Sequence, residues 1–585
     1  MSYNICNAKG MDNVRDVKRI SEVIRSVNPE VVALQELDSV TTRSGGTDVA
    51  KEIADLTRMY HVYGPAISFQ GGKYGIAILS REKPLSSKLY PLPGREEARA
   101  LLLVEFADYA FLCTHLSLTE EDATESLRMA DRIASEYPKP VIIAGDFNLT
   151  PQTAGIQEMQ KRWKPLSNLK HATYPSDGPK NTIDYIMGFT GNGQRFTVLG
   201  NRVLNEPVAS DHAPLFADIR IPVPANQVMR TIPYLQQPGT DEMTVMWMTH
   251  VPCRSWVEYG TDTTNLTRAR SFIEGEMVAN NKLNRIRLEG LHPGTRYYYR
   301  VVSQEITLYR AYHKEFGDTI CSPFHSFRTL DEKAENFTVA IFNDLHKNYR
   351  LFDKLSAQIK DANCDLVIFN GDCIDDAENE EAIVGTIDYY GRKYGSESIP
   401  SIYLRGNHET RGEYSVLLWD YLGRTGGDRT YGSFTLGDTR FVLMDAGEDK
   451  PDTHPVYYDM NDFTGYRMEQ AAFLTREIAS KPFKKASKRV LIHHIPIYGQ
   501  TDSYNPCLEI WGPVMDKARF DICLNAHTHR YNHLSKGEAG NPFPVVVGGG
   551  NGEETATFAL LQKRGKALTL TVYDTAGNVK ITLNL

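Results

Sequence analysis

The second half of the chain carries metal-binding residue types at the ends of successive apolar runs. FTVAIFNDLH, CDLVIFNGD, SIYLRGNHE, KRVLIHHIP and ICLNAHTH are each typical of a short strand that ends on Asp, Asn or His. Divalent ions bind carboxylates, imidazoles and amide oxygens, and a shared carboxylate can hold two ions that clamp both oxygens of a phosphoryl displacement. One HxH alone is uninformative, but five such elements in order predict a metal site. The candidates are Asp344, His346, Asp372, Asn407, His408, His494, His527 and His529.

The first half holds a second, different set at strand ends: Asn4, Glu36, His115, Asp146, Asn148, Asp184, Asp211 and His212. Glu36 suits Mg²⁺, which takes one or two carboxylates together with substrate oxygens. His212 can take a proton from water if a carboxylate orients its other nitrogen. His115 can hydrogen-bond a phosphate, and the two asparagines can orient neutral contacts. Taken alone, SDH favours a capped turn, and GDFN fits a turn or bulge equally well.

The elements that must position these residues change along the chain. Residues 1–222 alternate short strands with helical patterns, among them helices over 13–27 and 125–137. Residues 223–332 contain short aromatic and β-branched strands, which predict a small β-sandwich. Residues 333–585 return to an α/β pattern. The prediction is an α/β multidomain protein with domains over 1–222, 223–332 and 333–585, and with a linker near 222–228.

The order D-x-H, G-D, G-N-H-E, a single His and then H-x-H over 333–585 resembles the calcineurin-like metallophosphoesterases. The resemblance implies an α/β-sandwich domain with two divalent metals. His408 would face the substrate and protonate or orient the leaving oxygen. His494 is preferred to His493 because the family pattern is His-x-Pro, and His493 remains the alternative. By the resemblance, Asp344, His346, Asp372 and His529 hold one metal, and Asp372, Asn407, His494 and His527 hold the other.

The segment before that domain narrows the family. EMTVMWMT, VEYG, LEGLHPGTRYYYRV and FRT resemble the amino-terminal, fibronectin-III-like sandwich of purple acid phosphatases. Those enzymes carry D-x-G where this chain has Asp344-Leu345-His346, and a metal-binding Tyr where it has Asp375. We therefore expect a colourless site that takes Mn, Fe, Zn or Mg. Strong visible absorption of the iron-loaded protein would contradict this.

The first half, with QELD, CTHLS, AGDFN, TIDYI and ASDHAPL in order, resembles the endonuclease/exonuclease/phosphatase superfamily over residues 1–222. The resemblance implies a two-sheet α/β sandwich with Mg or Mn held by Glu36. His212 would be a general base paired with Asp184, and Asp146 would align the nucleophile. His115 would stabilise the transition state, and Asp211 would support the metal or His212.

Bulk properties restrict the partners. The 585-residue chain has a net charge of −8 and no basic run, so nucleic acid is possible but not favoured as a substrate. A small-molecule, lipid or sugar phosphate ester is preferred. No apolar run is long enough to span a membrane. Because MSYNICN begins almost directly with a strand, we expect that a targeting segment was removed and that the protein works outside the cytoplasm. Oligomeric state is not indicated.

Together, the two halves predict a metal-dependent phosphoric ester hydrolase with two different catalytic domains. The preferred hypothesis is sequential: the first domain cleaves a phosphodiester, and the second removes the remaining phosphate. One alternative is a phosphatase joined to an independent Mg-dependent nuclease. Another is that one domain serves only as a binding scaffold.

Overall fold

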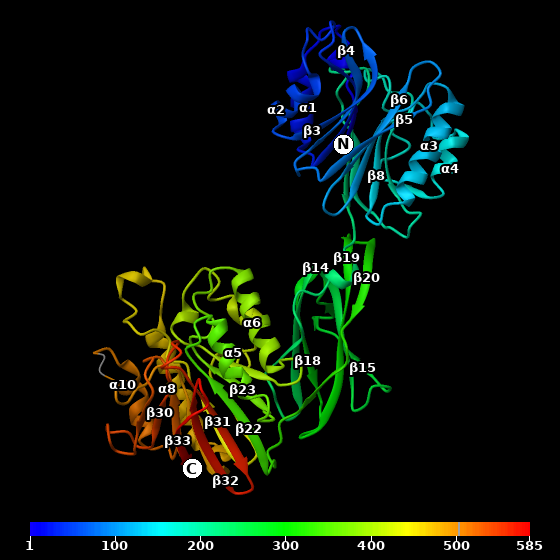
Figure 1. Ribbon diagram of the computed structural model, residues 1–585. Coiled ribbons are helices and arrows are strands. Elements are labelled where there is room, and N and C mark those ends of the chain that lie inside the picture. The colour runs from blue at the N-terminus through cyan, green and yellow to red at the C-terminus, as the bar shows by residue number, and fades with distance from the viewer. Residues whose placement is uncertain (501–502) are drawn as a thin grey trace. The chain divides into compact units, whose positions relative to one another are not determined.

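The computed structural model describes residues 1–500 and 503–585, which form two compact units (Figure 1). Unit 1 comprises Met1–Pro222 and Thr307–Phe316, and unit 2 comprises Val223–Ile306 and Gly317–Leu585. The first boundary lies in the proline-containing stretch where the sequence predicts a linker. The division into three domains, with a further boundary at 332, stays a prediction.

Unit 1 contains two six-stranded sheets, in the orders β11-β12-β1-β2-β4-β3 and β5-β6-β7-β8-β10-β9. Aliphatic side chains of both sheets fill the space between them, while α1 and α2 cover one outer face and α3 and α4 the other (Figure 1). The elements are β1 (Ser2–Asn4), α1 (Val17–Val27), β2 (Val31–Ser39), α2 (Val49–Thr57), β3 (Tyr60–Phe69), β4 (Gly72–Ser80), β5 (Ser86–Leu92), β6 (Arg99–Glu105), β7 (Ala110–His115), α3 (Glu120–Ser135), β8 (Val141–Asp146), α4 (Ala154–Met159), β9 (Trp163–Pro165), β10 (Asp184–Phe189), β11 (Thr197–Val203) and β12 (Leu215–Arg220).

The helix predicted over 13–27 is present but shorter. It begins at Val17 because Asp16, in an extended conformation, caps it by accepting the N–H groups of Lys18 and Arg19. The helix predicted over 125–137 is α3, which begins earlier, at Glu120. Its first turn is acidic, which favours an earlier start since carboxylates stabilise a helix amino terminus.

Residues 229–330, all of them described, form strands and contain no helix. They belong to unit 2, except for Thr307–Phe316, which belong to unit 1. These strands are β13 (Tyr234–Gln236), β14 (Glu242–Gly260), β15 (Thr267–Ala269), β16 (Phe272–Ile273), β17 (Glu276–Met277), β18 (Asn281–Glu289), β19 (Arg296–Tyr309), β20 (Lys314–Cys321) and β21 (His325–Arg328). Most of them belong to a thirteen-stranded sheet that continues into the α/β region, where β13 pairs in parallel with β24.

The α/β region of unit 2 places the sheet that contains β22, β23 and β24 against a second sheet, β25-β26-β27-β28-β30-β29. Helices α5 and α6 pack on the outer face of the first sheet, and α8 and α10 on that of the second. The elements are β22 (Asn336–Phe342), α5 (Tyr349–Ala357), β23 (Leu366–Asn370), α6 (Glu380–Tyr394), β24 (Ser401–Leu404), α7 (Leu418–Tyr421), β25 (Gly432–Leu436), β26 (Thr439–Leu443), α8 (Phe463–Ala479), α9 (Lys481–Lys485), β27 (Lys488–Ile492), α10 (Pro506–Met515), β28 (Ile522–Asn525), β29 (Asn532–Leu534), β30 (Val545–Val547), β31 (Thr557–Arg564), β32 (Ala567–Asp574) and β33 (Val579–Asn584).

Strand direction explains where the polar residues gather. Strands β22, β23 and β24 are parallel to one another, and so are β26, β27, β28 and β30. Their carboxyl ends therefore meet at one edge of each sheet, which is where open α/β sheets place their sites.

Candidate active sites

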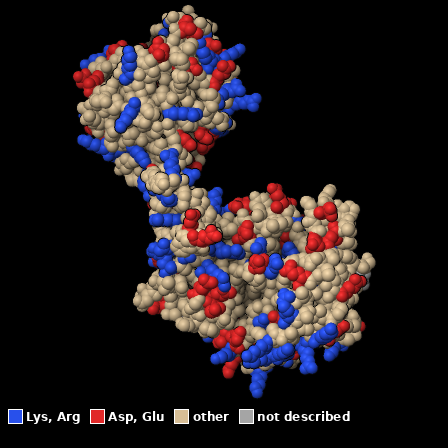
Figure 2. All heavy atoms as spheres, turned by 180° about the vertical axis from the view of Figure 1, so that it is seen from behind, with Lys and Arg blue, Asp and Glu red and all other residues tan. Residues whose placement is uncertain are grey.

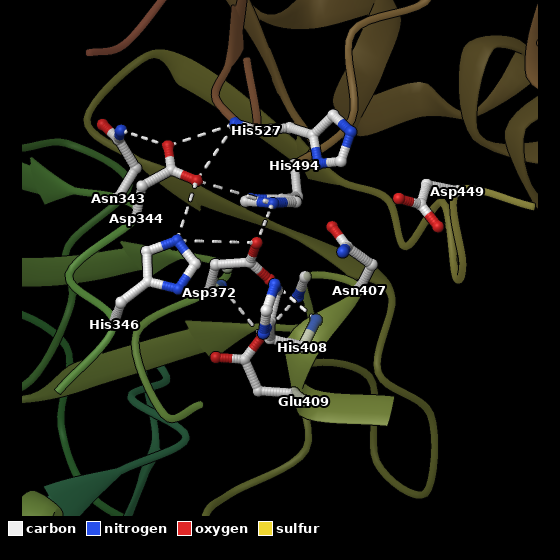
Figure 3. Close-up of polar contacts among 12 residues, drawn as sticks. Asn343, Asp344, His346, Asp372, Asn407, His408, Glu409, Asp449, His494 and His527 are labelled. Atoms are coloured by element: carbon white, nitrogen blue, oxygen red, sulfur yellow. Dashed lines mark hydrogen bonds and ion pairs between the residues drawn. The ribbon is translucent and has the colours of Figure 1, made fainter. Parts of the chain in front are cut away.

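The predicted ligand residues of unit 2 come together at these strand ends (Figure 3). Asp344, His346 and His529 form one group of ligand atoms within 4.8 Å of one another, and Asp372, His494 and His527 form another. The carboxylate of Asp372 also belongs to a third group, with His346 and His408. Each of the first two groups contains residues of one predicted ligand set, and Asp372 belongs to the second and the third group.

The distances within these groups are those of donors turned toward common points. His529 Nε2 lies 3.5 Å from Asp344 Oδ1 and 2.9 Å from His346 Nε2. His494 Nε2 lies 3.1 Å from Asp372 Oδ2 and 3.8 Å from Asp344 Oδ1. Both aspartates and His494 are almost completely buried. Buried carboxylates and imidazoles grouped in this way are the donor types that divalent cations bind.

Asn407 gives a separate test of whether a metal fits. Its side-chain oxygen is buried and has no hydrogen-bond partner in the part of the chain that the structure describes. Leaving a buried acceptor unpaired costs about 1–3 kcal/mol. A metal ligand at this position removes the cost, so the donor set fits divalent cations.

The backbone carries strain at the ligands themselves. Asp344, His346, Asp372, His527 and His529 all have φ between 46° and 71°, a left-handed conformation that is rare for non-glycine residues. Such conformations cost about 1–3 kcal/mol each and are retained where the surroundings hold them. Here they turn the side chains at the strand ends toward one centre.

The two adjacent histidines point in different directions. His494 Nδ1 contacts the carbonyl oxygen of Asn370 at 2.7 Å, which leaves its Nε2 facing Asp372. His493 instead contacts the carbonyl of Ile495 and the thiol of Cys523. The structure thus brings His494, and not His493, to the other ligands.

Charges at this centre act on one another strongly. Burial would lower the pKa of His494, but Asp372 and then Asp344 raise it to about 10. Burial would likewise raise the pKa of Asp372, but His494 holds it well below its usual range. Without metal, this pair is therefore an imidazolium beside a carboxylate.

Three residues beside the site were not assigned roles from the sequence. Asp375 Oδ1 lies 2.6 Å from His346 Nδ1 and 3.1 Å from His408 Nδ1, so one carboxylate orients both rings. The motifs mark position 375 only by its lack of a tyrosine. Carboxylates commonly fix the ring of a metal-bound histidine, so an aspartate at position 375 could have indicated this role.

Glu409 is the last residue of the GNHE motif. Its buried carboxylate accepts the backbone N–H groups of Asp372, Cys373, Ile374 and Gly406 at 2.8–2.9 Å. Burial and the neighbouring Asp372 raise the pKa of Glu409 to about 7. The carboxylate holds the loop that carries Asp372.

Arg411 lies next to His408, with Nη1 3.2 Å from His408 Nε2. Its Nε and Nη2 donate to the buried carboxylate of Glu448 at 3.1 and 3.2 Å. One edge of the guanidinium is therefore anchored, and the other faces the site. About a third of the side chain is exposed.

The glycine run after β30 packs against the ligands. A Cβ atom on Gly550 would lie 2.3 Å from Cβ of His529, and one on Gly548 would lie 2.3 Å from Oδ1 of Asn343. Asn343 in turn donates to Asp344 Oδ2 at 2.8 Å and to the carbonyl of Gly549 at 2.7 Å. Residues without side chains let this loop approach and fix Asp344.

In unit 1, strand register brings the second set of residues together. Asp146 on β8 lies opposite Asp184 on antiparallel β10 and beside His115 on parallel β7. Asn4 on β1 donates from Nδ2 to Glu36 Oε1 at 3.0 Å and to Asp146 Oδ2 at 3.1 Å. The site therefore draws residues from both sheets.

His212 lies between two carboxylates. Its Nδ1 lies 2.9 Å from Asp184 Oδ2, and its Nε2 lies 3.5 Å from Asp146 Oδ2. Burial would lower the pKa of His212, but the carboxylates of Asp184 and Asp146 raise it to about 10. Burial, and then Asp184, raises the pKa of Asp146.

The remaining predicted residues lie around this group. Asn148, with φ of 53°, donates its backbone N–H to Asp146 Oδ1 and its side-chain amide to the carbonyl of Leu116. Asp211 accepts the hydroxyl of Ser210 at 3.3 Å and is not part of the grouped ligand atoms, which are those of Asp146, Asp184 and His212. The oxygens of Glu36 and Asp146, together with a buried Asp184 Oδ1 that lacks a hydrogen-bond partner among the described residues, fit a hard cation such as Mg²⁺.

Comparison with known proteins finds three family models along the chain. Residues 1–212 match the endonuclease/exonuclease/phosphatase family, residues 231–329 the purple acid phosphatase N-terminal domain, and residues 337–531 the calcineurin-like phosphoesterases. The chain is thus a fusion of segments that each match one of these family models. The resemblances inferred from the motifs are thereby confirmed.

Curated relatives match about half of the chain. Purple acid phosphatase 15 of Arabidopsis thaliana is 25% identical over 320 residues, which is 47% of this chain and 54% of that protein. Acid phosphatase type 7 of Homo sapiens is 28% identical over 328 residues, which is 52% of this chain and 69% of that protein. The fusion spans about half the length of the first of these relatives.

Solved structures resemble each part. Purple acid phosphatase PPD1 from yellow lupin seeds is 17% identical, covers 60% of the fusion and 73% of its own chain, and has a TM-score of 0.46. An endonuclease/exonuclease/phosphatase from Beutenbergia cavernae is 18% identical, covers 55% of the fusion and 98% of its own chain, and has a TM-score of 0.32.

No described helix is long and apolar enough to cross a membrane.

Proposed function

We propose that the fusion is a metal-dependent phosphoric ester hydrolase with two unlike catalytic centres, one in each unit. The observation that carries the proposal is the position of Asp372, which lies within reach of ligand groups on both sides. Clusters of this kind suit two divalent cations, whereas the oxygen-rich cluster of unit 1 suits a single Mg²⁺ or Mn²⁺.

In unit 2, we assign Asp344, His346, Asp372 and His529 to one metal, and Asp372, Asn407, His494 and His527 to the other. Two cations held there would neutralise the phosphoryl oxygens and activate water. Because Asp375 stands where a tyrosine ligand would be needed for colour, Mn, Fe, Zn or Mg would give a colourless protein.

The chain's own groups in unit 2 have separate tasks. His408 protonates or orients the leaving oxygen, and Asp375 fixes its ring through Nδ1. Arg411 presents Nη1 beside that ring, so it can bind a phosphate oxygen while Glu448 holds its other edge.

In unit 1, Asp184 orients His212 through Nδ1, so that Nε2 can take a proton from the attacking water. Asp146 aligns that water, with Asn148 and Asn4 fixing the carboxylate. Glu36 would hold the metal, and Asp211 supports it or His212. His115 hydrogen-bonds the phosphate as charge develops.

The two centres would act in sequence on one diester: unit 1 leaves a monoester, and unit 2 releases phosphate. Small-molecule, lipid or sugar phosphates are the preferred substrates. On the face drawn in Figure 2, cationic and anionic side chains are interspersed over both units, in keeping with the net charge of −8. The following stay predictions: the nuclease and scaffold alternatives, the fibronectin-III-like fold of the strand region and a location outside the cytoplasm.

The test uses bis(4-nitrophenyl) phosphate and 4-nitrophenyl phosphate with Mn²⁺ or Mg²⁺. Asp146→Ala should lose diester cleavage and keep monoester hydrolysis, whereas Asp372→Ala should cleave the diester without releasing phosphate. Asp108→Ala and Asp361→Ala, at exposed aspartates of the two units, are the matched controls. The sequential scheme fails if both active-site variants release phosphate from the diester like the parent. Hydrolase activity itself is refuted if the parent cleaves neither ester with Mn, Fe, Zn or Mg.

A further inference from the structure

Arg99, the first residue of β6, lies against His115 of the unit 1 site. Antiparallel pairing sets Ala100 opposite His115, which brings the preceding arginine beside the ring. Its Nη1 lies 3.2 Å from His115 Nδ1, and only 8% of the side chain is exposed. The family motifs quoted above do not include this arginine.

The contact determines which ring nitrogen of His115 carries the proton. A guanidinium has only N–H donors and stays protonated in proteins, so it cannot accept a hydrogen bond. Nδ1 of His115 must therefore be the acceptor, and in the neutral ring the proton lies on Nε2. That Nε2 lies 3.6 Å from Asp146 Oδ2, and so faces the centre of the site.

His212 approaches the same oxygen of Asp146, but its Nδ1 faces an acceptor and not a donor. Its Nε2 lies 3.5 Å from Asp146 Oδ2, but its Nδ1 contacts Asp184, a carboxylate that only accepts. In the neutral ring, Nδ1 then carries the proton and Nε2 is free to take one. Two histidines thus flank one carboxylate oxygen at nearly equal distances, and their Nδ1 atoms have opposite partners: a donor at His115 and an acceptor at His212.

The other contacts of Arg99 are too loose to explain its burial. Its nearest carboxylate contacts are Glu97 at 3.4 Å and Glu96 at 3.5 Å, and the Glu96 carboxylate already accepts the hydroxyl of Ser117 and the N–H of Leu118. Its buried Nε has no hydrogen-bond partner among the described residues. The contact with His115, at 3.2 Å, is thus shorter than either carboxylate contact of Arg99.

We propose that Arg99 is a positioning residue that fixes the Nε2–H form of His115, so that His115 donates a hydrogen bond to the substrate phosphate while His212 accepts the proton of water. Arg99 and Asp184 thereby give the two histidine side chains opposite tasks. The inference rests on the proposed hydrolase function of unit 1.

The test compares three replacements of Arg99 in an Asp372→Ala background, in which only the unit 1 centre turns over bis(4-nitrophenyl) phosphate. Glutamine keeps a donor without the charge, lysine keeps both, and methionine keeps neither. We expect Arg99→Met to lower kcat about 100-fold with KM within about threefold, comparable to loss of one transition-state donor, and Arg99→Gln to retain much of the rate. Arg95→Met, at an exposed arginine paired with Asp122, is the control.

A spectroscopic readout separates positioning from packing. Long-range ¹H–¹⁵N spectra of the full chain labelled at histidine should show His115 protonated at Nε2 in the parent and in Arg99→Gln, but at Nδ1 or mixed in Arg99→Met. The signal is assigned with His115→Gln. Protonation at Nδ1 in the parent overturns the proposal. The proposal is also overturned if only Arg99→Lys retains the rate while KM rises in Arg99→Gln and Arg99→Met, because that result would mean that only the charge matters. If the Asp372→Ala parent cleaves no diester, the hydrolase function of unit 1 fails, and the spectra still decide the role of Arg99.

Discussion

Replacing Glu409 by glutamine should destabilise unit 2 and release Asp372. The carboxylate has two oxygens with two N–H donors each: Oε1 accepts from Cys373 and Ile374, and Oε2 from Asp372 and Gly406. Glutamine keeps only one acceptor oxygen. Whichever way its amide turns, two buried donors lose their acceptor and face an NH₂ group.

The expected cost follows from this count. A buried donor without a partner costs about 1–3 kcal/mol, so two cost about 2–6 kcal/mol, with about 4 kcal/mol as the centre of the range. If unit 2, with about 350 residues, unfolds as one cooperative unit, its unfolding entropy is about 0.7 kcal/mol/K. The unfolding temperature of unit 2 should then fall by about 5 °C.

Calorimetric melts of the full chain measure this shift, with metal analysis of the same samples. The experiment is done at pH 8.5, above the raised pKa of about 7, so that the parent carboxylate is ionised. Glu413→Gln removes an equal charge at an exposed position four residues away and should leave the melt unchanged. A melt of Glu409→Gln within 1 °C of the parent, with full metal content, would refute the reasoning.

Three further predictions concern the two centres. Asp375→Asn should weaken binding of Mn²⁺ to unit 2 about 10–100-fold in a metal titration, because an amide has no negative charge to pair with the rings of His346 and His408; unchanged affinity would exclude an orienting role. Asp184→Asn should lower unit 1 diester turnover about 10³–10⁴-fold, as the amide favours the wrong ring form of His212, and a loss below tenfold would show that His212 is not the base. Since Asp372 overcomes the effect of burial and raises the pKa of His494 to about 10, metal binding near pH 8 should release about one proton from this residue. Apparent metal affinity should accordingly rise about tenfold per pH unit up to that value; binding heats that are equal in buffers of different ionisation enthalpy would contradict this.

The candidate residues chosen from the sequence lie together because parallel strands carry them to one edge of a sheet. Once a run such as CDLVIFNGD is interpreted as a parallel strand, its final Asp372 must lie at the same sheet edge as Asp344 and Asn407. The supporting residues are harder to predict. Glu409 acts on backbone N–H groups of another loop, which leave no side-chain signature. Arg99 reaches His115 only through the register of a hairpin.

The two Gly-Asp pairs, at Asp146 and Asp372, show how topology changes the chemistry of one local pattern. Strand β8 has an antiparallel neighbour whose register sets a second carboxylate, Asp184, directly opposite Asp146. Strand β23 has parallel neighbours on both sides, so Asp372 meets residues from the turns that follow strands, chiefly His494. Burial, followed by the neighbouring carboxylate, raises the pKa of Asp146, whereas at Asp372 the imidazolium overcomes burial and lowers the pKa. A buried strand that ends on Gly-Asp therefore predicts a carboxylate at a site, while the direction of the neighbouring strands decides whether it pairs with an acid or with a metal-binding histidine.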